Sequence, residues 1–286
     1  MITLRSEASQ GMALSAPATL YVGLLVAAPL GILVVYSFWT QTYVSIDRTF
    51  TWENYRLAVE DPLVRHLLIR SVWIAGLVTA ATVALAYPIA YFIAFRTRHK
   101  TLWLLLITIP FWTSYLLRVF SWKLILGFNG VLNSALMTVG LIEEPLTFLL
   151  YNEVAVVLTL AHAWAPFAIM PIYVSLQKID RSLLEAATDL GCSKLERFVR
   201  VTLPLTVPGI IAACLIIFIP TVGDYVTPAL VGGSDGKMIA NLIQVQFGAA
   251  NNWPLGATLS LMAMLAVGLV AGCFVLLSNL LARRIR

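Results

Sequence analysis

The chain has 286 residues, of which 60% are hydrophobic and 12% are charged, and its mean hydropathy is +0.88. Soluble domains carry about 25% charged residues, so this composition excludes an ordinary soluble domain and predicts a surface that mostly faces lipid. We attribute the formal net charge of +5 to membrane topology and expect no nucleic-acid partner.

The long apolar stretches of the chain predict membrane-spanning helices. A helix rises 1.5 Å per residue and needs about 20 apolar residues to cross a bilayer. The stretches are continuously apolar and do not alternate, which favours helices over barrel strands. We therefore predict an all-α membrane protein with six transmembrane helices. Their expected ranges are residues 17–39, 71–95, 101–122, 154–177, 204–223 and 255–282. These helices form a single transmembrane domain, residues 17–282, between an N-terminal segment (1–16) and a basic tail (283–286).

Residues 124–142 are also uncharged and long enough to cross a membrane. Three glycines and two asparagines in this stretch suit a folded external segment better than a lipid-facing helix. A seventh span here would also move residues 178–200 to the outer side and spoil the charge asymmetry of the loops. We therefore place residues 124–142 outside the membrane.

The distribution of charge predicts the orientation of the chain. Lysine and arginine near the ends of spans favour the cytoplasmic side. With six spans, the inner segments hold 12 lysines and arginines against five acids, whereas the outer loops hold four basic residues against nine acids. Arg70, Arg118 and Lys123 lie at predicted outer ends of spans. The pattern predicts that both termini are cytoplasmic.

The inner loop between the fourth and fifth predicted spans, residues 178–203, has the pattern of two short helices. Ser182 with Glu185, and Ser193 with Glu196, fit the S-x-x-E capping box of a helix start. Gly191 lies between them, where a left-handed C-terminal cap costs least. The apolar face of the first helix consists of Leu183, Leu184, Ala187 and Leu190. This face could equally dock on another subunit or pack on the chain's own cytoplasmic helix ends.

The same loop carries a family motif. It has Glu-Ala-Ala at residues 185–187, then three intervening residues before Gly191, and nine more before Val-Thr-Leu-Pro at residues 201–204. This pattern resembles the EAA signature of the permease subunits of bacterial ABC importers, in which isoleucine is usual at the position of Val201. The resemblance implies the type I ABC importer permease fold, with six spans and a cytoplasmic coupling helix between spans four and five.

In that family the coupling helix docks in a cleft of the ATPase subunit. The resemblance implies that Ala186 and Ala187 permit a close approach, that Gly191 turns the chain, and that Glu185 fixes the helix start. Pro204 would pass the motion of the docked helix into the fifth span. The expected ATPase-coupling residues are Glu185, Ala186, Ala187, Gly191, Leu203 and Pro204.

Four further segments are similar to the permeases of spermidine/putrescine importers, and this likeness extends from about residue 21 onward. The segments are residues 109–118 (IPFWTSYLLR), 184–191 (LEAATDLG), 204–211 (PLTVPGII), and Gln246 with residues 252–254 (NWP). The resemblance implies a bacterial inner-membrane subunit that translocates polyamines. Its implied partners are a second homologous permease, a dimer of ATPase subunits and a periplasmic polyamine-binding protein. ATP and Mg²⁺ would bind to the ATPase, so we expect no cofactor in this chain.

The sequence has no motif of an enzyme or a metal site. Residues 236–238 (GKM) lack the earlier glycine and the final Ser or Thr of a phosphate-binding loop. His66, His99 and His162 are widely scattered, and we expect a hydrogen-bonded packing role for His162 rather than a ligand role. The three cysteines lie in the inner loop and in spans, where no disulfide is expected. We predict no catalytic and no metal-binding residue, so the energy source must be another subunit.

Asp224 is the first candidate for a residue on the transport path. It follows an apolar run and lies between Pro220 and Pro228, which lack the N–H that a regular helix needs. Such a broken helix end favours a position that lines a cavity rather than lipid. The Asp224 carboxylate could attract an ammonium group, and Tyr225 could stack on a cation. Alternatively, Asp224 caps a helix or pairs with a basic residue at the outer rim.

Trp112, Thr113 and Tyr115 follow a proline late in the predicted third span. They are further candidates for the transport path, although aromatic residues at this depth also form ordinary interfacial belts. Arg118 and Lys123 end the same span, and we expect them to extend outward or to pair with outer glutamates.

Three functions are compatible with the sequence. The first is a polyamine permease of an ABC importer, and the second is an ABC permease for another small solute such as sulfate, iron or thiamine. The third is an ion-coupled secondary transporter, which would work without an ATPase and usually contains inverted repeats. We find no such repeat in the sequence, and an EAA loop has no role in that mechanism.

Overall fold

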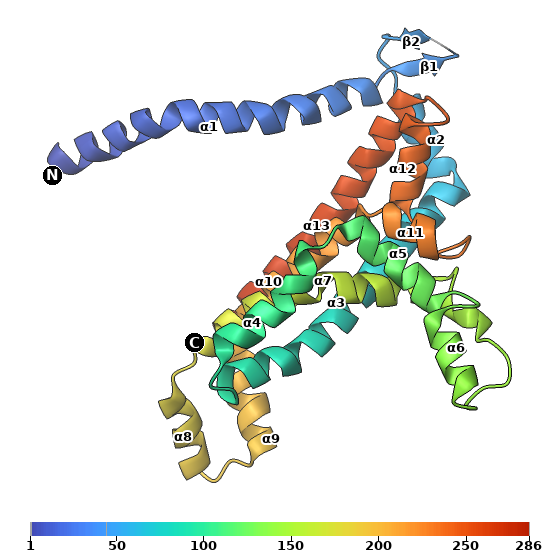
Figure 1. Ribbon diagram of the computed structural model, residues 1–286. Coiled ribbons are helices and arrows are strands. Elements are labelled where there is room, and N and C mark those ends of the chain that lie inside the picture. Colours follow the sequence, from blue (N-terminus) through green and yellow to red (C-terminus); the bar gives the residue numbers. More distant parts are fainter. Residues whose placement is uncertain (1, 44, 286) are drawn as a thin grey trace. The chain divides into compact units, whose positions relative to one another are not determined.

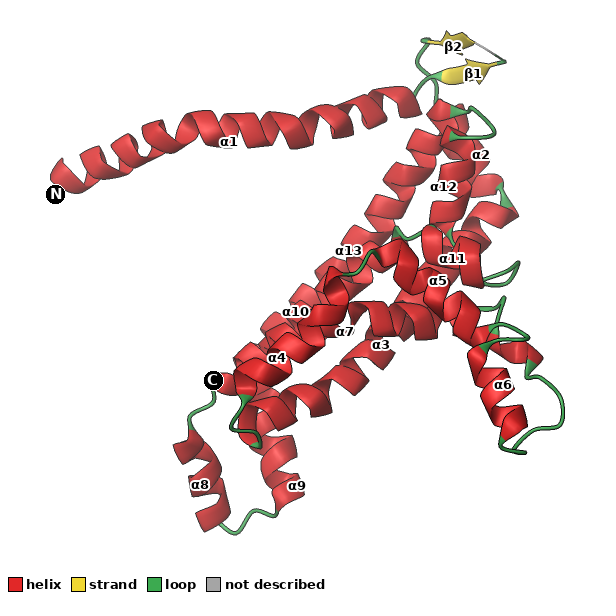
Figure 2. Ribbon diagram, viewed as in Figure 1, coloured by secondary structure: helices red, strands yellow, loops and turns green. Residues whose placement is uncertain are grey.

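The computed structural model describes residues 2–43 and 45–285, and the side chains of residues 14–43 and 45–276. Most of it is helical (Figure 2), as the all-α prediction requires. Six helical stretches in this part of the chain are long and apolar enough to cross a membrane. They are Leu14–Ser37, Pro62–Phe95, Tyr115–Thr138, Glu153–Gln177, Lys194–Val222 and Trp253–Leu276. The predicted number of six is confirmed.

The chain divides into two compact units, which are described separately. The first unit comprises the residues up to Pro62 together with Val245–Met262. It contains α1 (Ile2–Ser37), the antiparallel strands β1 (Thr40–Thr42) and β2 (Ser45–Asp47), α2 (Glu53–Glu60) and the first turns of α13 (Trp253–Ile285).

Asn54 of α2 holds the first unit together. Its side chain is 5% exposed, and its amide donates to the backbone carbonyls of Ser37, at 3.0 Å, and Trp39, at 2.6 Å. The hydroxyl of Thr258 in α13 donates to the same Ser37 carbonyl at 3.2 Å. A buried amide with its hydrogen bonds satisfied in this way fixes the end of α1 to α2 and α13.

The second unit comprises Leu63–Gln244 with the residues from Ala263 onward. Its elements are α3 (Pro62–Phe95), α4 (Lys100–Thr108), the 3-10 turn η1 (Ile109–Trp112), α5 (Tyr115–Leu126), α6 (Val131–Thr138), η2 (Thr147–Leu149), α7 (Glu153–Gln177), α8 (Arg181–Asp189), α9 (Lys194–Arg197), the π-helical turn η3 (Phe198–Thr202), α10 (Leu203–Val222), α11 (Val226–Val231), most of α12 (Ile239–Phe247) and the rest of α13.

The core of the second unit lies between α3, α7 and α10 (Figure 1). A Cβ atom at Gly209 of α10 would lie 2.6 Å from the Pro171 carbonyl oxygen of α7, so only glycine allows these helices to approach so closely. The hydroxyls of Tyr87 in α3 and Thr206 in α10 lie 2.9 Å apart. Since lipid is as apolar as the core side chains, close packing and such polar contacts hold the bundle together.

The predicted third span, residues 101–122, is not one helix. Helix α4 and turn η1 end at Trp112, and Thr113 and Ser114 have extended backbone before α5 begins. Pro110 cannot donate to the helical ladder, and the Thr113 hydroxyl donates to the Pro110 carbonyl at 2.6 Å. The break could not be predicted from the distribution of charges, because threonine and serine are uncharged.

The third span-length stretch, Tyr115–Thr138, lies later than predicted and includes most of the segment that the sequence placed outside. It bends where α5 meets α6. The Gly130 N–H donates to the Gly127 carbonyl at 2.8 Å, and a Cβ atom at Gly130 would lie 2.5 Å from the Leu124 carbonyl oxygen. The glycines that argued against a helix therefore form a tight turn between two helices.

The other helices differ from the prediction mainly at their ends. Helix α3 begins at Pro62 rather than at residue 71 and thus includes Arg70. Helix α1 begins at Ile2, so the predicted N-terminal segment is continuous with the first span-length helix. Helix α13 extends to Ile285, into the predicted basic tail. The two terminal residues of the chain lie outside the described residues.

Candidate functional site

The segment of residues 178–203, which the sequence predicts to be cytoplasmic, is called here the coupling segment after its predicted role. It begins with α8, and Asp180 caps this helix. Its Oδ1 atom accepts the backbone N–H of Ser182 at 3.0 Å. This bond favours the ionised carboxyl and so lowers the pKa of Asp180. The predicted capping box of Ser182 and Glu185 is wrong, because α8 begins at Arg181 and Glu185 lies inside it. Glu185 therefore does not fix the helix start.

Gly191 ends α8 in the predicted left-handed conformation, with φ at +83°. The Gly191 N–H donates to the Thr188 carbonyl at 2.9 Å, and the Cys192 N–H donates to the Ala187 carbonyl at 3.0 Å. This pair of bonds is the Schellman motif, which satisfies the last carbonyls of a helix. The predicted turn at Gly191 is confirmed.

The second predicted capping box is present. The Ser193 hydroxyl accepts the Glu196 N–H at 3.3 Å, and Glu196 Oε2 accepts the Ser193 N–H at 2.9 Å. Helix α9 then passes through the wide turn η3 into α10, where Leu203 and Pro204 occupy the first turn. The coupling segment is therefore joined to α10 by unbroken helical backbone, Lys194–Val222.

The predicted apolar face of α8 is divided between two environments. Ala187 is 7% exposed and Leu184 packs against the core. In contrast, Leu183 is 48% exposed, Leu190 is 85% exposed, and Ala186 is exposed as well. One part of the face, Ala187 and Leu184, therefore packs on the chain's own helices. The other part, Leu183, Ala186 and Leu190, forms an exposed apolar edge.

Glu185 lines a cavity of about 450 Å³ between α8, α9 and the end of α3. Its lining combines the basic side chains of Arg96, Arg181, Lys194 and Arg197 with the rings of Tyr91 and Phe95. Within the described part of the chain, Glu185 forms no ion pair with any of these basic residues. Reasoning from the sequence did not find this cavity, because its residues come from three separate helices.

Asp224 lies in the break between α10 and α11. Its Oδ1 atom accepts the backbone N–H of Val226 at 2.9 Å and that of Thr227 at 3.4 Å, so it caps α11. Its Oδ2 atom accepts the hydroxyl of Tyr115 at 2.5 Å. The predicted break and the predicted alternative of a helix cap are therefore confirmed.

Tyr115, the first residue of α5, ties this helix to α11. Besides its bond to Asp224, its hydroxyl oxygen lies 2.6 Å from Oγ1 of Thr227. The structure thus brings together two residues that were predicted as separate candidates. A carboxylate offers about four lone-pair positions, and that of Asp224 accepts three bonds. Asp224 is half-buried, so its remaining position can receive one more donor.

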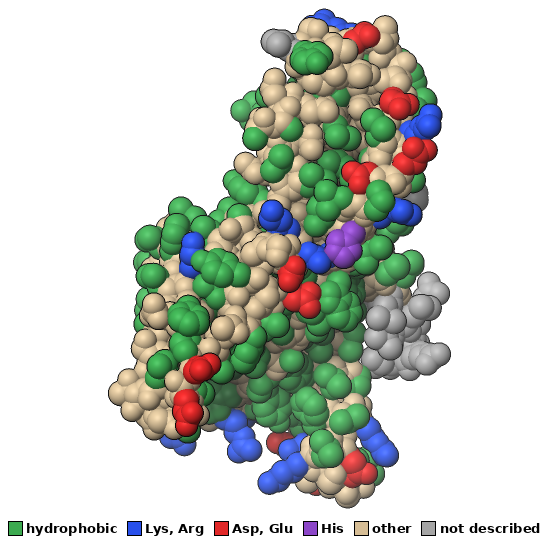
Figure 3. Space-filling view, turned by 90° about the vertical axis from the view of Figure 1, so that its right-hand side faces the viewer, with side chains coloured by type: hydrophobic (Ala, Val, Ile, Leu, Met, Phe, Trp, Pro, Cys, Tyr) green, Lys and Arg blue, Asp and Glu red, His purple; other side chains and the backbone are tan. Residues whose placement is uncertain are grey.

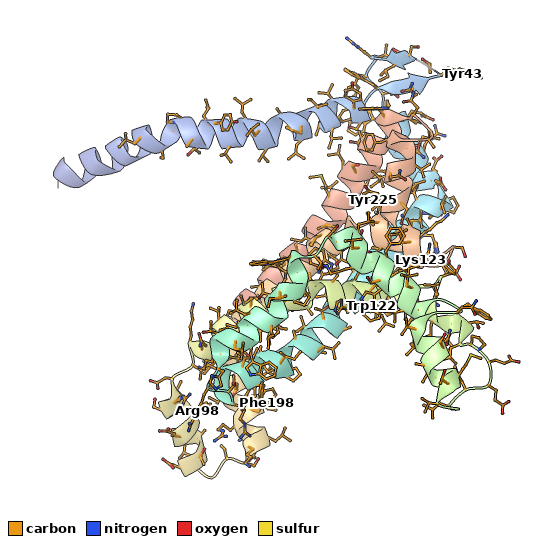
Figure 4. The ribbon with its side chains drawn as sticks, viewed as in Figure 1. Tyr43, Arg98, Trp122, Lys123, Phe198 and Tyr225 are labelled. Carbon is orange, nitrogen blue, oxygen red and sulfur yellow. The ribbon has the colours of Figure 1, made fainter. Side chains whose placement is uncertain are left out.

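The other path candidates lie apart from this carboxylate. Trp112 is 86% exposed and Thr113 is exposed, and in the described structure neither forms a hydrogen bond with Asp224. Their exposure is typical of an interfacial belt. Tyr225, the residue after Asp224, is labelled in Figure 4. Its side chain is 48% exposed, and its backbone carbonyl accepts the side-chain amide of Asn241 at 2.8 Å.

Arg118 has contacts that the sequence did not indicate. Its guanidinium carbon lies 4.4 Å from the ring centre of Phe111 and 6.0 Å from that of Tyr115. Its Nη1 donates to the Ala163 carbonyl at 3.5 Å. Neither Arg118 nor Lys123 has an ion pair in the described residues, so the expected pairing with outer glutamates is not observed. The contact between Arg118 and Tyr115 had one signal in the sequence. The two residues are three positions apart, which places them on one face of a helix.

His162 forms the hydrogen bond that was predicted for it, although the residue is exposed. Its Nδ1 accepts the Trp122 ring N–H at 3.2 Å, and the two rings meet edge to face with centres 5.4 Å apart. This bond places the proton of a neutral imidazole on Nε2. The described residues contain no group of three or more possible metal ligands.

A second cavity, of about 470 Å³, lies at the start of α7, on the side that the charge pattern predicts to be external. It is lined by Arg70, Phe148, Asn152, Glu153, Val154 and Asp235. Arg70 Nη1 donates to the Ser234 carbonyl at 3.4 Å. The cavity offers two carboxylates and an aromatic ring beside one arginine.

Comparison with known proteins identifies relatives over most of the chain. The family described as binding-protein-dependent transport system inner membrane component matches residues 71–286. The spermidine/putrescine transport system permease protein PotB of Escherichia coli (strain K12) is 38% identical over 265 residues. That alignment covers 92% of this chain and 95% of the relative.

Two solved structures share the fold. One is a bacterial ABC transporter involved in the import of the acidic polysaccharide alginate, with a TM-score of 0.71, 15% identity and 99% of each chain covered. The other is a bacterial alginate ABC transporter in complex with an alginate pentasaccharide-bound periplasmic protein, with a TM-score of 0.68, 16% identity, and 98% of this chain and 96% of that chain covered. The family match and the nearly full-length likeness to PotB show that this chain belongs to the binding-protein-dependent inner-membrane components, the permease subunits of ABC importers.

Proposed function

We propose that this permease subunit translocates polyamines, spermidine or putrescine. The observation that carries the proposal is the 38% identity to a spermidine/putrescine permease over 92% of the chain. The two alginate transporters share the fold of this chain, but their identity to it is only 15% and 16%. A likeness at this level carries no information about the cargo. Family membership removes the ion-coupled secondary transporter from the candidates.

The proposed assembly contains this chain, a second homologous permease, a dimer of ATPase subunits and a periplasmic polyamine-binding protein. The solved complex of an alginate transporter with its periplasmic protein supports the last of these. The sequence has no phosphate-binding loop, which supports the view that ATP and Mg²⁺ bind to the ATPase and not to this chain. The chain is a multi-pass protein of the inner membrane, and we propose that both of its termini are cytoplasmic.

The coupling segment is proposed to dock on the ATPase through the exposed edge of α8. Leu183, Ala186 and Leu190 give this edge an apolar surface. The Schellman motif at Gly191 and the capping box at Ser193 make the turn between α8 and α9 stiff. A displacement of α8 is then passed into α10 as the motion of a rigid body.

Asp224 is proposed to attract the ammonium groups of the cargo. Its carboxylate is held in place by Tyr115 and by the first N–H groups of α11, with one lone-pair position left. Tyr225, half exposed one residue later, can stack on a cation.

The coupling assignment is tested by uptake of labelled spermidine in cells that lack their own polyamine importers. Glu185→Arg and Gly191→Val should abolish uptake while the protein still inserts into the membrane. Glu144→Arg, which makes the same charge change in the loop before α7, is the matched control and should leave uptake intact. Normal uptake in both coupling variants would contradict the assignment.

The cargo is tested in the same cells by competition. An excess of unlabelled putrescine should suppress uptake of labelled spermidine, whereas sulfate, iron and thiamine should not. If one of these solutes is itself imported and spermidine is not, the polyamine proposal fails and the permease assignment stands.

A further inference from the structure

The cavity between α8, α9 and the end of α3 has an uncompensated positive charge. Four basic side chains line it, from Arg96, Arg181, Lys194 and Arg197, against the single acid Glu185. Among the residues that the structure describes, none of these five takes part in an ion pair within 4.0 Å. In Figure 3, several lysine and arginine side chains lie along the lower edge of the view, beside a few acidic ones.

The neighbouring acids are engaged elsewhere and do not neutralise the cavity. Glu196 accepts the Ser193 N–H at 2.9 Å and lies 4.0 Å from Arg200. Asp180 accepts the Ser182 N–H at the start of α8. Both carboxylates therefore serve as helix caps, which leaves the basic residues of the cavity available for an external anion.

One of the basic residues is already held in position. Arg197 Nη1 donates to the Thr188 hydroxyl at 2.7 Å, and this hydroxyl donates to the Leu184 carbonyl at 2.8 Å. The guanidinium is thus fixed against α8, and its remaining N–H groups are free to form further bonds. A planar guanidinium matches the oxygen spacing of phosphate and can bind it through two hydrogen bonds.

The cavity also has an aromatic wall at the membrane end. The rings of Tyr91 and Phe95, in the last turns of α3, lie 5.0 Å apart, and Phe198 of η3 lies 6.1 Å from Tyr91. Arg96 follows directly after α3. Aromatic side chains at the end of a span, followed by basic side chains, match the boundary between the apolar and charged parts of a phospholipid.

We propose that this cavity binds a phosphate group at the inner face of the membrane. An anionic phospholipid headgroup and a free phosphate share the required chemistry. The inner leaflet favours the lipid, because anionic lipids concentrate there around basic residues. A phosphate in the cavity would contact the end of α3 together with α8 and α9, and would tie the coupling segment to the membrane-spanning bundle.

The test uses the full chain and two double variants with the same change in charge. Arg96→Gln with Arg197→Gln removes two charges from the cavity. Arg98→Gln with Arg200→Gln removes two charges from the same cytoplasmic side, at positions that do not line it. One arm measures binding of phosphatidylglycerol by native mass spectrometry after transfer from mixed micelles. The other measures binding of inorganic phosphate to the delipidated protein by calorimetry.

The cavity variant should bind the probe about thirtyfold more weakly, which is about 2 kcal/mol for two basic residues. The control variant should bind as the unchanged chain does. Binding of phosphatidylglycerol alone identifies the lipid as the source, and binding of inorganic phosphate identifies the free anion. Weaker binding of either probe by the cavity variant supports the site, provided that circular dichroism shows that the variant keeps its fold.

Three outcomes would overturn the proposal. The first is equal loss of binding in both double variants, which would indicate only general surface charge. The second is no binding of either probe by the unchanged chain. The third is unchanged binding of both probes by the cavity variant. Loss of the co-purified ATPase in that variant would then identify the basic cluster as a protein-docking surface.

Discussion

Asp224→Asn separates the structural role of this side chain from its charge. The amide oxygen of asparagine can accept the Val226 N–H, as Oδ1 of Asp224 does at 2.9 Å, so α11 keeps its cap. The amide NH₂ group takes the place of Oδ2, and the Tyr115 hydroxyl can accept a bond from it. The substitution therefore removes one negative charge and leaves the local fold nearly unchanged.

The size of the effect follows from Coulomb's law. Two unit charges about 5 Å apart interact by about 3 kcal/mol at an effective dielectric constant of about 20. Asp224 is half-buried, and solvent screening reduces this value to about 1.5 kcal/mol. Since 1.4 kcal/mol is a factor of ten, the KM for spermidine should rise about tenfold.

The assay is the initial rate of labelled spermidine uptake into proteoliposomes that contain the complete importer. Glu144→Gln is the control for charge, and its KM should not change. Asp224→Ala also loses the cap, and its unfolding free energy should fall by about 0.5–2 kcal/mol. If Asp224→Asn leaves KM unchanged, Asp224 is a helix cap only, and the reasoning about cation attraction is refuted.

Three further predictions concern the framework of the site. Gly209→Val places side-chain atoms against a backbone carbonyl of α7, so the yield of monodisperse protein in detergent should drop, whereas Gly268→Val, which meets open space, should leave it unchanged. The capping bond lowers the pKa of Asp180, so its contribution to stability is present above the unfolded pKa of the carboxyl and is lost as pH falls through the lowered folded pKa. Amide exchange in α8, corrected for its intrinsic rate, should therefore stay level between about pH 5 and 8 and rise only below about pH 4. Cys192, in a background without the other two cysteines, should react with an impermeant maleimide only after the cells are permeabilised. Labelling in intact cells would contradict the cytoplasmic position of the coupling segment.

The number of membrane spans could be predicted from the sequence, because lipid excludes charge and the gaps between charges are visible in it. The limits of the spans could not be predicted in the same way. The break at Thr113 and Ser114 lies in an uncharged stretch, and its cause is backbone geometry next to Pro110. The turn at Gly130 likewise depends on a close approach of backbone atoms that composition does not reveal.

The features of the candidate site that depend only on neighbouring residues in the sequence could be predicted. The Schellman turn requires a glycine, and Gly191 supplies it at φ +83°. The start of α8 was mispredicted because two good capping residues, Asp180 and Ser182, lie two positions apart, and the sequence does not show which one accepts the N–H. The bond of Tyr115 to Asp224 could not be predicted at all, because it depends on how α5 packs against α11.

The two halves of the candidate site are joined by one piece of helical backbone. Lys194–Val222 is 29 residues long, which at 1.5 Å per residue is about 44 Å and exceeds the apolar thickness of a bilayer. Its N-terminal end carries the capping box of the coupling segment, and its C-terminal end stops two residues before Asp224. A displacement of the N-terminal end must therefore either bend this helix or move Asp224. The carboxylate is bonded to Tyr115 on a different helix, so its movement changes the 2.5 Å contact between them. This connection supplies a physical route by which an ATPase acting on α8 can alter the environment of a cation near Asp224.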